Sequence, residues 1–207
     1  MLFSIKKIIA NTRNVSFSHK LSTLTRFQGI LTLFMSTIKK GNIMARVTRK
    51  GIIVETIGEL PSVGTAAPAF ILTQPDLSDL SLASLKGKTV VLSIFPSIDT
   101  PTCATTVRQF NSKATKVDDV VVVCVSADLP FALGRFCGAE GIENVVVGSS
   151  FRSNFGEDYH VTFSSGPLTG LLSRSVVVIG KDGLVRYTEQ VPNTSQEPNY
   201  AAALAML

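Results

Sequence analysis

The stretch TVVLSIFPSIDTPTC, residues 89–103, decides the fold of this chain. Residues 89–95 are almost continuously apolar, which predicts a strand buried on both faces of a sheet. Residues 104–116 are compatible with a helix, so Cys103 is expected where the strand gives way to the helix's first turn. Free backbone N–H groups and the positive end of the helix dipole lie at such a position. Both favour the thiolate of Cys103, which is the reactive form of a cysteine.

Strands and helices alternate on either side of this stretch. Upstream, the sequence predicts a β-hairpin over residues 47–55, a strand over 69–73 and a polar helical turn over 77–85. Downstream, it predicts a buried strand over 120–126, a helix over 130–139, a strand over 144–148, a short helix over 153–159, a hairpin of strands 173–179 and 184–189, and a final helix over 197–207. This order implies an α/β sheet covered on both faces.

The charge is divided unevenly along the chain. Residues 1–50 hold 10 of the 20 Lys and Arg residues and no Asp or Glu. The other 10 basic residues and all 15 acids lie in residues 51–207, which gives this part a net charge of −5. The overall charge of +5 therefore does not indicate a nucleic-acid surface on the folded domain. No run approaches the roughly 18–20 apolar residues that cross a bilayer, so a membrane is not an expected partner either.

The three cysteines are an odd number in a domain of ordinary size, which favours reactive thiols over a disulfide scaffold. Cys124 lies inside VVVVCVS on a strand expected to be buried on both faces, so its thiol is interpreted as structural and inert. Cys137 lies near the end of a predicted helix and is followed by Gly138 and Gly141, on an element that can loosen.

The pattern Pro-x-x-x-Thr-x-x-Cys, made by Pro96, Thr100 and Cys103, resembles the peroxidatic site of peroxiredoxins. Residues 46–207 are similar to the thiol peroxidase branch, the atypical two-cysteine peroxiredoxins, in FPSIDT, VCVSADLPFA, RFCGAEG, GPLTGLLSRSVVVI and EPNYAAALA. The resemblance implies a thioredoxin-like fold, a central mixed sheet flanked by helices, with an N-terminal β-hairpin. Pro101 departs from the family, which usually carries a small residue there, and is expected to change the stiffness of the loop.

The resemblance also implies a role for each site residue. Cys103 would be the peroxidatic cysteine, and Cys137 in FCGAEG would be the resolving cysteine that forms a redox disulfide with it. Thr100 can place its hydroxyl beside the sulfur as donor and acceptor. Arg174 would face the sulfur from a neighbouring strand, where its charge favours the thiolate and the transition state. Pro96 would support the site by making the turn rigid.

The function that follows from this resemblance is a thiol peroxidase of antioxidant defence. It would reduce hydrogen peroxide and organic hydroperoxides through a sulfenic acid and an intramolecular disulfide, with thioredoxin as the reductant. A homodimer is expected, and no metal, haem or flavin cofactor. The 34-residue spacing from Cys103 to Cys137 argues against a peroxiredoxin of the bacterioferritin-comigratory type. A redox sensor or chaperone-like binding module that uses the same disulfide to switch a partner remains an alternative.

Other residues are interpreted as structural. Asp99 is expected to cap the helix that carries Cys103, and Arg108 is expected to form a local ion pair. The chain has no Cys-x-x-Cys, no Cys/His pair at metal-binding spacing and no Gly-rich phosphate loop. This argues against a thioredoxin-type reductase, a zinc site and a Cys-His hydrolase.

Residues 1–43 have no counterpart in the resemblance and allow two interpretations. They are basic, rich in Ser and Thr and free of acids, which is the composition of a mitochondrial transit peptide. Alternatively, Met44 is the true start and the codons for residues 39–41 contain a bacterial ribosome-binding sequence. We favour the second interpretation, and with it a bacterial cytoplasmic protein, because this branch is chiefly bacterial. Either way the folded domain is expected to be 44–207.

Deleting residues 1–43 should change neither the thermal stability nor the peroxidase rate. A domain of net negative charge offers this basic segment only weak, exposed partners at its surface. The measurement compares the melting temperature and the rate of a protein that starts at Met44 with those of the full chain. A melting temperature lower by several degrees would mean that the segment docks on the domain, and both interpretations would then be wrong.

Overall fold

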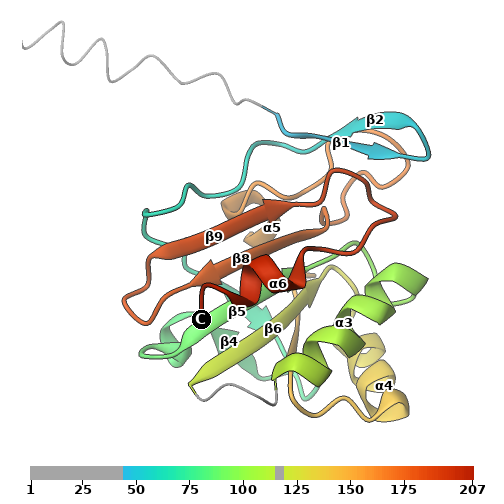
Figure 1. Ribbon diagram of the computed structural model, residues 1–207. Coiled ribbons are helices and arrows are strands. Elements are labelled where there is room, and N and C mark those ends of the chain that lie inside the picture. The colour runs from blue at the N-terminus through green and yellow to red at the C-terminus, as the bar shows by residue number, and fades with distance from the viewer. Residues whose placement is uncertain (1–43, 115–118) are drawn as a thin grey trace, which may run out of the picture. The chain divides into compact units, whose positions relative to one another are not determined.

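The computed structural model describes residues 44–114 and 119–207 (Figure 1). These residues form a sheet with the strand order β4-β3-β7-β6-β5-β8-β9 and a separate hairpin, β1-β2. The strands are β1 (Arg46–Arg49), β2 (Ile52–Glu55), β3 (Ile71–Thr73), β4 (Asp79–Ser81), β5 (Thr89–Ile94), β6 (Val120–Ser126), β7 (Val146–Ser149), β8 (Ser175–Ile179) and β9 (Val185–Gln190). The helices are α3 (Pro101–Ala114), α4 (Pro130–Glu140), α5 (Phe155–Asp158) and α6 (Tyr200–Leu204), with a 3-10 turn η1 (Ala83–Leu85).

Strand β5 lies inside the sheet, parallel to β6 on one side and antiparallel to β8 on the other. All six of its residues are buried. Val90, Leu92 and Ile94 belong to one hydrophobic cluster, and Val91 belongs to a second, because alternate side chains of a strand point to opposite faces. The second cluster also takes side chains from α3, α4 and α6, and the first takes side chains from α5 and η1. The predicted mixed α/β sheet covered on both faces is therefore confirmed.

The predicted helical turn over residues 77–85 is wrong for most of its length. Asp79–Ser81 is the strand β4, which pairs antiparallel with β3, and only Ala83–Leu85 is helical. Leu80 is buried between two more exposed neighbours, which is the alternation of a half-buried strand. The side chain of Asp76 accepts hydrogen bonds from the N–H and the hydroxyl of Ser78, and this turn closes the hairpin.

The final helix is shorter than the predicted 197–207, because Asn199 caps it. The Asn199 side chain accepts a hydrogen bond from the N–H of Ala202 at 3.0 Å, so the helix begins at Tyr200 and Pro198 lies outside it. The helix that carries Cys103, α3, begins at Pro101, which is earlier than the predicted Ala104. Both hairpins are found where they were predicted, with Lys50 and Gly51 at positive φ in the first turn. No helix among the described residues has the length and apolar composition needed to cross a membrane.

Candidate active site

The loop between β5 and α3 leads into the candidate nucleophile, Cys103. Phe95 still donates its N–H to the carbonyl of Val125 at 3.0 Å, and the chain then turns through residues 96–100. The N–H of Thr100 bonds to the carbonyl of Ser97 at 3.1 Å, which closes the turn. Because α3 begins at Pro101, Cys103 lies in the first turn of the helix, where proline at the first position is well tolerated.

Two donors contact the sulfur of Cys103. The hydroxyl of Thr100 lies 2.8 Å from Sγ, and Nη2 of Arg174 lies 3.4 Å from the same atom. The residue itself is fully buried within the second hydrophobic cluster. The hydroxyl and the guanidinium are both hydrogen-bond donors, and the low dielectric of the largely apolar surrounding strengthens their interaction with the sulfur.

Arg174 is a buried cation, only 3% exposed. Arg174 directly precedes β8, whose first residue, Ser175, pairs with Ile94 at the end of β5. The sheet therefore brings the Arg174 side chain to the segment that follows β5 and contains Cys103. Its Nη2 also bonds to the carbonyl of Thr194 at 3.2 Å. Its Nε and Nη1 are buried and have no hydrogen-bond partner among the described residues. These two N–H-bearing atoms are donors that an oxygen atom brought beside the sulfur could use.

The other two thiols lie in different surroundings. Burial raises the pKa of the fully buried Cys124 thiol, and the nearby Cys137 adds to the effect. Burial also raises the pKa of the Cys137 thiol, which lies half-buried on α4 and packs against the cluster that contains Cys103. Helix α4 ends at Gly141, which adopts the left-handed conformation favoured by glycine, so Cys137 lies in its last turn. All three cysteines are free thiols in this structure.

Three further residues were assigned from the sequence. Pro96 is buried at the start of the loop, where its ring restricts the backbone. Arg108 forms the expected local ion pair, a two-pronged contact with Glu140 of α4 at 2.9 Å for each hydrogen bond. Asp99 is not the cap of α3, because the helix begins at Pro101 and leaves Asp99 two residues before it. Its carboxylate instead accepts a hydrogen bond from Arg135 at 3.2 Å.

Asp128 has no role predicted from the sequence, and the structure places it against the turn of residues 96–100. Its carboxylate accepts hydrogen bonds from Ser97 and Ile98, which lie 31 and 30 residues earlier in the chain. The one available signal was its place directly after a buried strand, where polar residues of α/β sheets gather. Within the described ranges, no group of three or more His, Cys, Asp or Glu residues is arranged to hold a metal ion.

Comparison with known proteins agrees with this geometry. Residues 62–204 match the family model described as Redoxin. A thiol peroxidase of Mycobacterium tuberculosis is 58% identical over 164 residues, which cover 79% of this chain and 99% of that protein. A thiol peroxidase of Corynebacterium glutamicum is 50% identical over 164 residues, which again cover 79% of this chain and 99% of that protein.

Solved structures agree on the fold. A peroxiredoxin-like protein from Aquifex aeolicus superposes with a TM-score of 0.74 at 37% identity, covering 79% of this chain and 99% of that one. A thiol peroxidase from Chromobacterium violaceum superposes with a TM-score of 0.72 at 21% identity, over 78% and 94% of the two chains, and supports the fold alone. The predicted thioredoxin-like fold is thereby confirmed. The chain belongs to the Redoxin family and, within it, to the thiol peroxidase peroxiredoxins, which are peroxidases.

Proposed function

We propose that this chain reduces hydrogen peroxide and organic hydroperoxides to water and alcohols at Cys103, in antioxidant defence. One observation carries the proposal: the Cys103 sulfur is held between the Thr100 hydroxyl and the Arg174 guanidinium. A buried guanidinium without a carboxylate partner is costly unless an anion lies beside it. The Cys103 thiolate is the anion that the described residues offer.

In the first step, the Cys103 thiolate attacks the terminal oxygen of the hydroperoxide. A sulfur–oxygen bond forms, the oxygen–oxygen bond breaks, and its electron pair leaves on the second oxygen, which takes up a proton to become water or an alcohol. The sulfur is thereby oxidised to a sulfenic acid. Negative charge moves from sulfur to oxygen in this step, so the unpartnered Nε and Nη1 of Arg174 are suited to stabilise the transition state.

In the second step, the thiol of Cys137 condenses with the sulfenic acid. A disulfide between Cys103 and Cys137 forms and one water molecule leaves. Because burial raises the pKa of Cys137, this thiol stays protonated in the reduced fold and does not compete for peroxide. Its place in the last turn of α4, next to the helix end at Gly141, allows the local opening that a disulfide requires.

In the third step, thioredoxin reduces the disulfide through its two thiols and becomes oxidised itself. This returns Cys103 and Cys137 to their reduced forms, so peroxide is consumed repeatedly. No metal or organic cofactor takes part in these three steps, since the electrons pass between sulfur atoms and the peroxide.

The working protein in this proposal is a homodimer of domain 44–207 in a bacterial cytoplasm, without nucleic-acid or membrane partners. The exposed large apolar side chains include Leu77, Leu129, Phe131 and Phe151. Their segments adjoin, because Arg152 donates to the carbonyl of Leu77 and Pro75 lies against Gly134 of α4. Apolar side chains that gather on one surface are typical of an interface. The bacterial relatives support the compartment.

Replacing Cys103 with Ser should abolish peroxide reduction, because an alcohol forms no nucleophilic anion at neutral pH. The measurement is steady consumption of hydrogen peroxide by the full chain, coupled to thioredoxin, thioredoxin reductase and NADPH. Wild-type turnover supports the enzyme. A single stoichiometric oxidation without turnover would instead favour the sensor or binding module, and residual turnover of the Ser variant would exclude Cys103 as nucleophile.

Replacing Cys137 with Ser should leave the first oxidation unchanged and stop the thioredoxin-linked turnover, because no thiol then condenses with the sulfenic acid. Mass spectrometry after one equivalent of peroxide should find a sulfenic acid on Cys103 and no disulfide. Cys124→Ser is the matched control and should retain full turnover. Normal turnover of the Cys137 variant would assign the resolving thiol elsewhere.

Replacing Arg174 with Met should slow the oxidation of Cys103 by ~100-fold, the usual cost of one lost donor to a developing oxyanion. Met fills a similar volume, so the fold should stay intact. The melting temperature of the variant checks this. Arg174→Lys keeps the charge but not the forked donors, and should recover part of the rate. Equal rates for the Met variant and the wild type would place Arg174 outside the reaction.

A further inference from the structure

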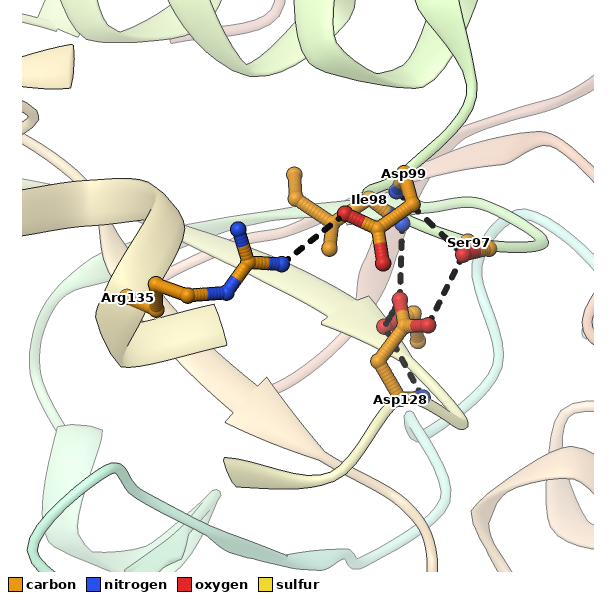
Figure 2. Close-up of polar contacts among 6 residues, drawn as sticks. Ser97, Ile98, Asp99, Asp128 and Arg135 are labelled. Atoms are coloured by element: carbon orange, nitrogen blue, oxygen red, sulfur yellow. Dashed lines mark hydrogen bonds and ion pairs between the residues drawn. The ribbon is translucent and has the colours of Figure 1, made fainter. Parts of the chain in front are cut away.

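The carboxylate of Asp128 accepts three hydrogen bonds between the sheet and the Cys103 loop. Oδ1 accepts from the hydroxyl of Ser97 at 2.8 Å, and Oδ2 accepts from the N–H of Ile98 at 2.7 Å and the hydroxyl of Ser126 at 2.7 Å. Figure 2 shows the Asp128 side chain pointing at the turn that contains Ser97 and Ile98. A backbone N–H and two hydroxyls that meet one carboxylate make a fixed contact, because an ionised carboxylate only accepts.

Asp128 is itself held from the other side. Its N–H bonds to the hydroxyl of Ser126 at 3.3 Å, and its carbonyl accepts from the hydroxyl of Ser149 at the end of β7. The carbonyl of Ser126 in turn accepts from the N–H of Ser150 at 2.8 Å. The carboxylate therefore projects from a segment tied to two strand ends, which makes it a rigid support for the turn that it contacts.

A continuous path of hydrogen bonds runs from Asp128 to the sulfur. The first bond joins Asp128 to the Ser97 hydroxyl at 2.8 Å. The second joins the Ser97 carbonyl to the N–H of Thr100 at 3.1 Å. The third joins the Thr100 hydroxyl to Sγ of Cys103 at 2.8 Å. Ser97 is thus fixed at both its side chain and its backbone, and the direction of the Thr100 hydroxyl depends on where Ser97 is held.

We propose that Asp128 is a positioning residue for the oxidation of Cys103: it holds the 96–100 turn so that Thr100 donates to the sulfur. The inference rests on the proposed function. Misplacing a reacting group by about 1 Å costs on the order of 100-fold in rate. Replacing Asp128 with Ala removes all three contacts and should slow the reaction of Cys103 with hydrogen peroxide by ~100-fold.

The conservative variant Asp128→Asn should recover most of the rate. Its carbonyl oxygen can still accept from the Ile98 N–H and the Ser126 hydroxyl, and its amide can donate to the Ser97 oxygen. The loss is one charge-assisted bond, so the rate should stay within ~10-fold of the wild type. If only the negative charge of Asp128 mattered, the Asn and Ala variants would have equal rates, because both remove that charge.

The same loop offers a matched control in Asp99. Its carboxylate pairs with Arg135 of α4 at 3.2 Å, and the side chains of Asp99 and Arg135 are 62% and 68% exposed. Figure 2 shows this pair beside the turn. Exposed ion pairs of this kind contribute little. Asp99→Asn removes an equal charge from an adjacent position and should leave the oxidation rate unchanged.

The experiment measures the second-order rate constant of the first oxidation in the full chain. Each variant is made in the Cys137→Ser background, hydrogen peroxide is mixed in at a temperature well below melting, and the sulfenic acid on Cys103 is trapped with dimedone and quantified by mass spectrometry. Ser97→Ala is measured alone and together with Asp128→Ala. If Asp128 acts through Ser97, Ser97→Ala slows the wild type but not the Asp128→Ala variant, since coupled residues are non-additive.

Three results would overturn the positioning role: a rate for Asp128→Ala equal to that of Asp99→Asn, an Asn variant as slow as the Ala variant, or fully additive effects of Ser97→Ala. If Asp128→Ala does not fold, the Asn variant and Ser97→Ala alone decide, and both at the wild-type rate would contradict the proposal. A parent protein that forms no sulfenic acid at all would instead remove the proposed function.

Discussion

The pairing of β5 with its two neighbours is the constraint on which the rest of this structure depends. β5 runs parallel to β6 and antiparallel to β8, so the end of β5 meets the end of β6 and the beginning of β8 at one edge of the sheet (Figure 1). Ile94 is paired with both Val125 and Ser175. The three segments that follow or precede these residues carry Cys103, Asp128 and Arg174, which is how groups up to 71 residues apart reach one site.

This arrangement concentrates polar groups where the surrounding core is apolar. Arg174 brings a positive charge into the interior, and two of its three nitrogens lack partners in the part of the chain that the structure describes. Such a group lowers the stability of the fold unless a paired anion or further hydrogen bonds offset its desolvation. The same low dielectric that makes the guanidinium costly strengthens its interaction with the Cys103 sulfur 3.4 Å away. The Thr100 hydroxyl adds a neutral donor to that interaction.

The differences between the predicted and the observed elements show how much of the fold follows from the sequence. The buried strands β5 and β6 were predicted within one residue, because a continuous apolar run has few other interpretations. The turn over residues 77–85 was misread as helical, because a three-residue strand shows its alternation only once Leu80 is known to be buried. The expectation that Asp99 caps the helix is wrong because the sequence does not define the residue at which α3 begins, and the helix begins at Pro101. A side chain that bonds locally, such as Asn199 before α6, shifts an element end without changing the fold.

The sequence by itself determined the layered α/β architecture and the place of Cys103, because both follow from local patterns: a buried apolar run, a turn and a helix start. It also pointed to Thr100 and Arg174 through family resemblance. Tertiary structure alone decided which groups touch the sulfur, that Arg174 is buried with unpartnered donors, and that Asp128 supports the 96–100 turn. The physical reason is that these contacts join segments distant in the chain, and sequence order restricts but does not determine which strand ends the sheet brings together.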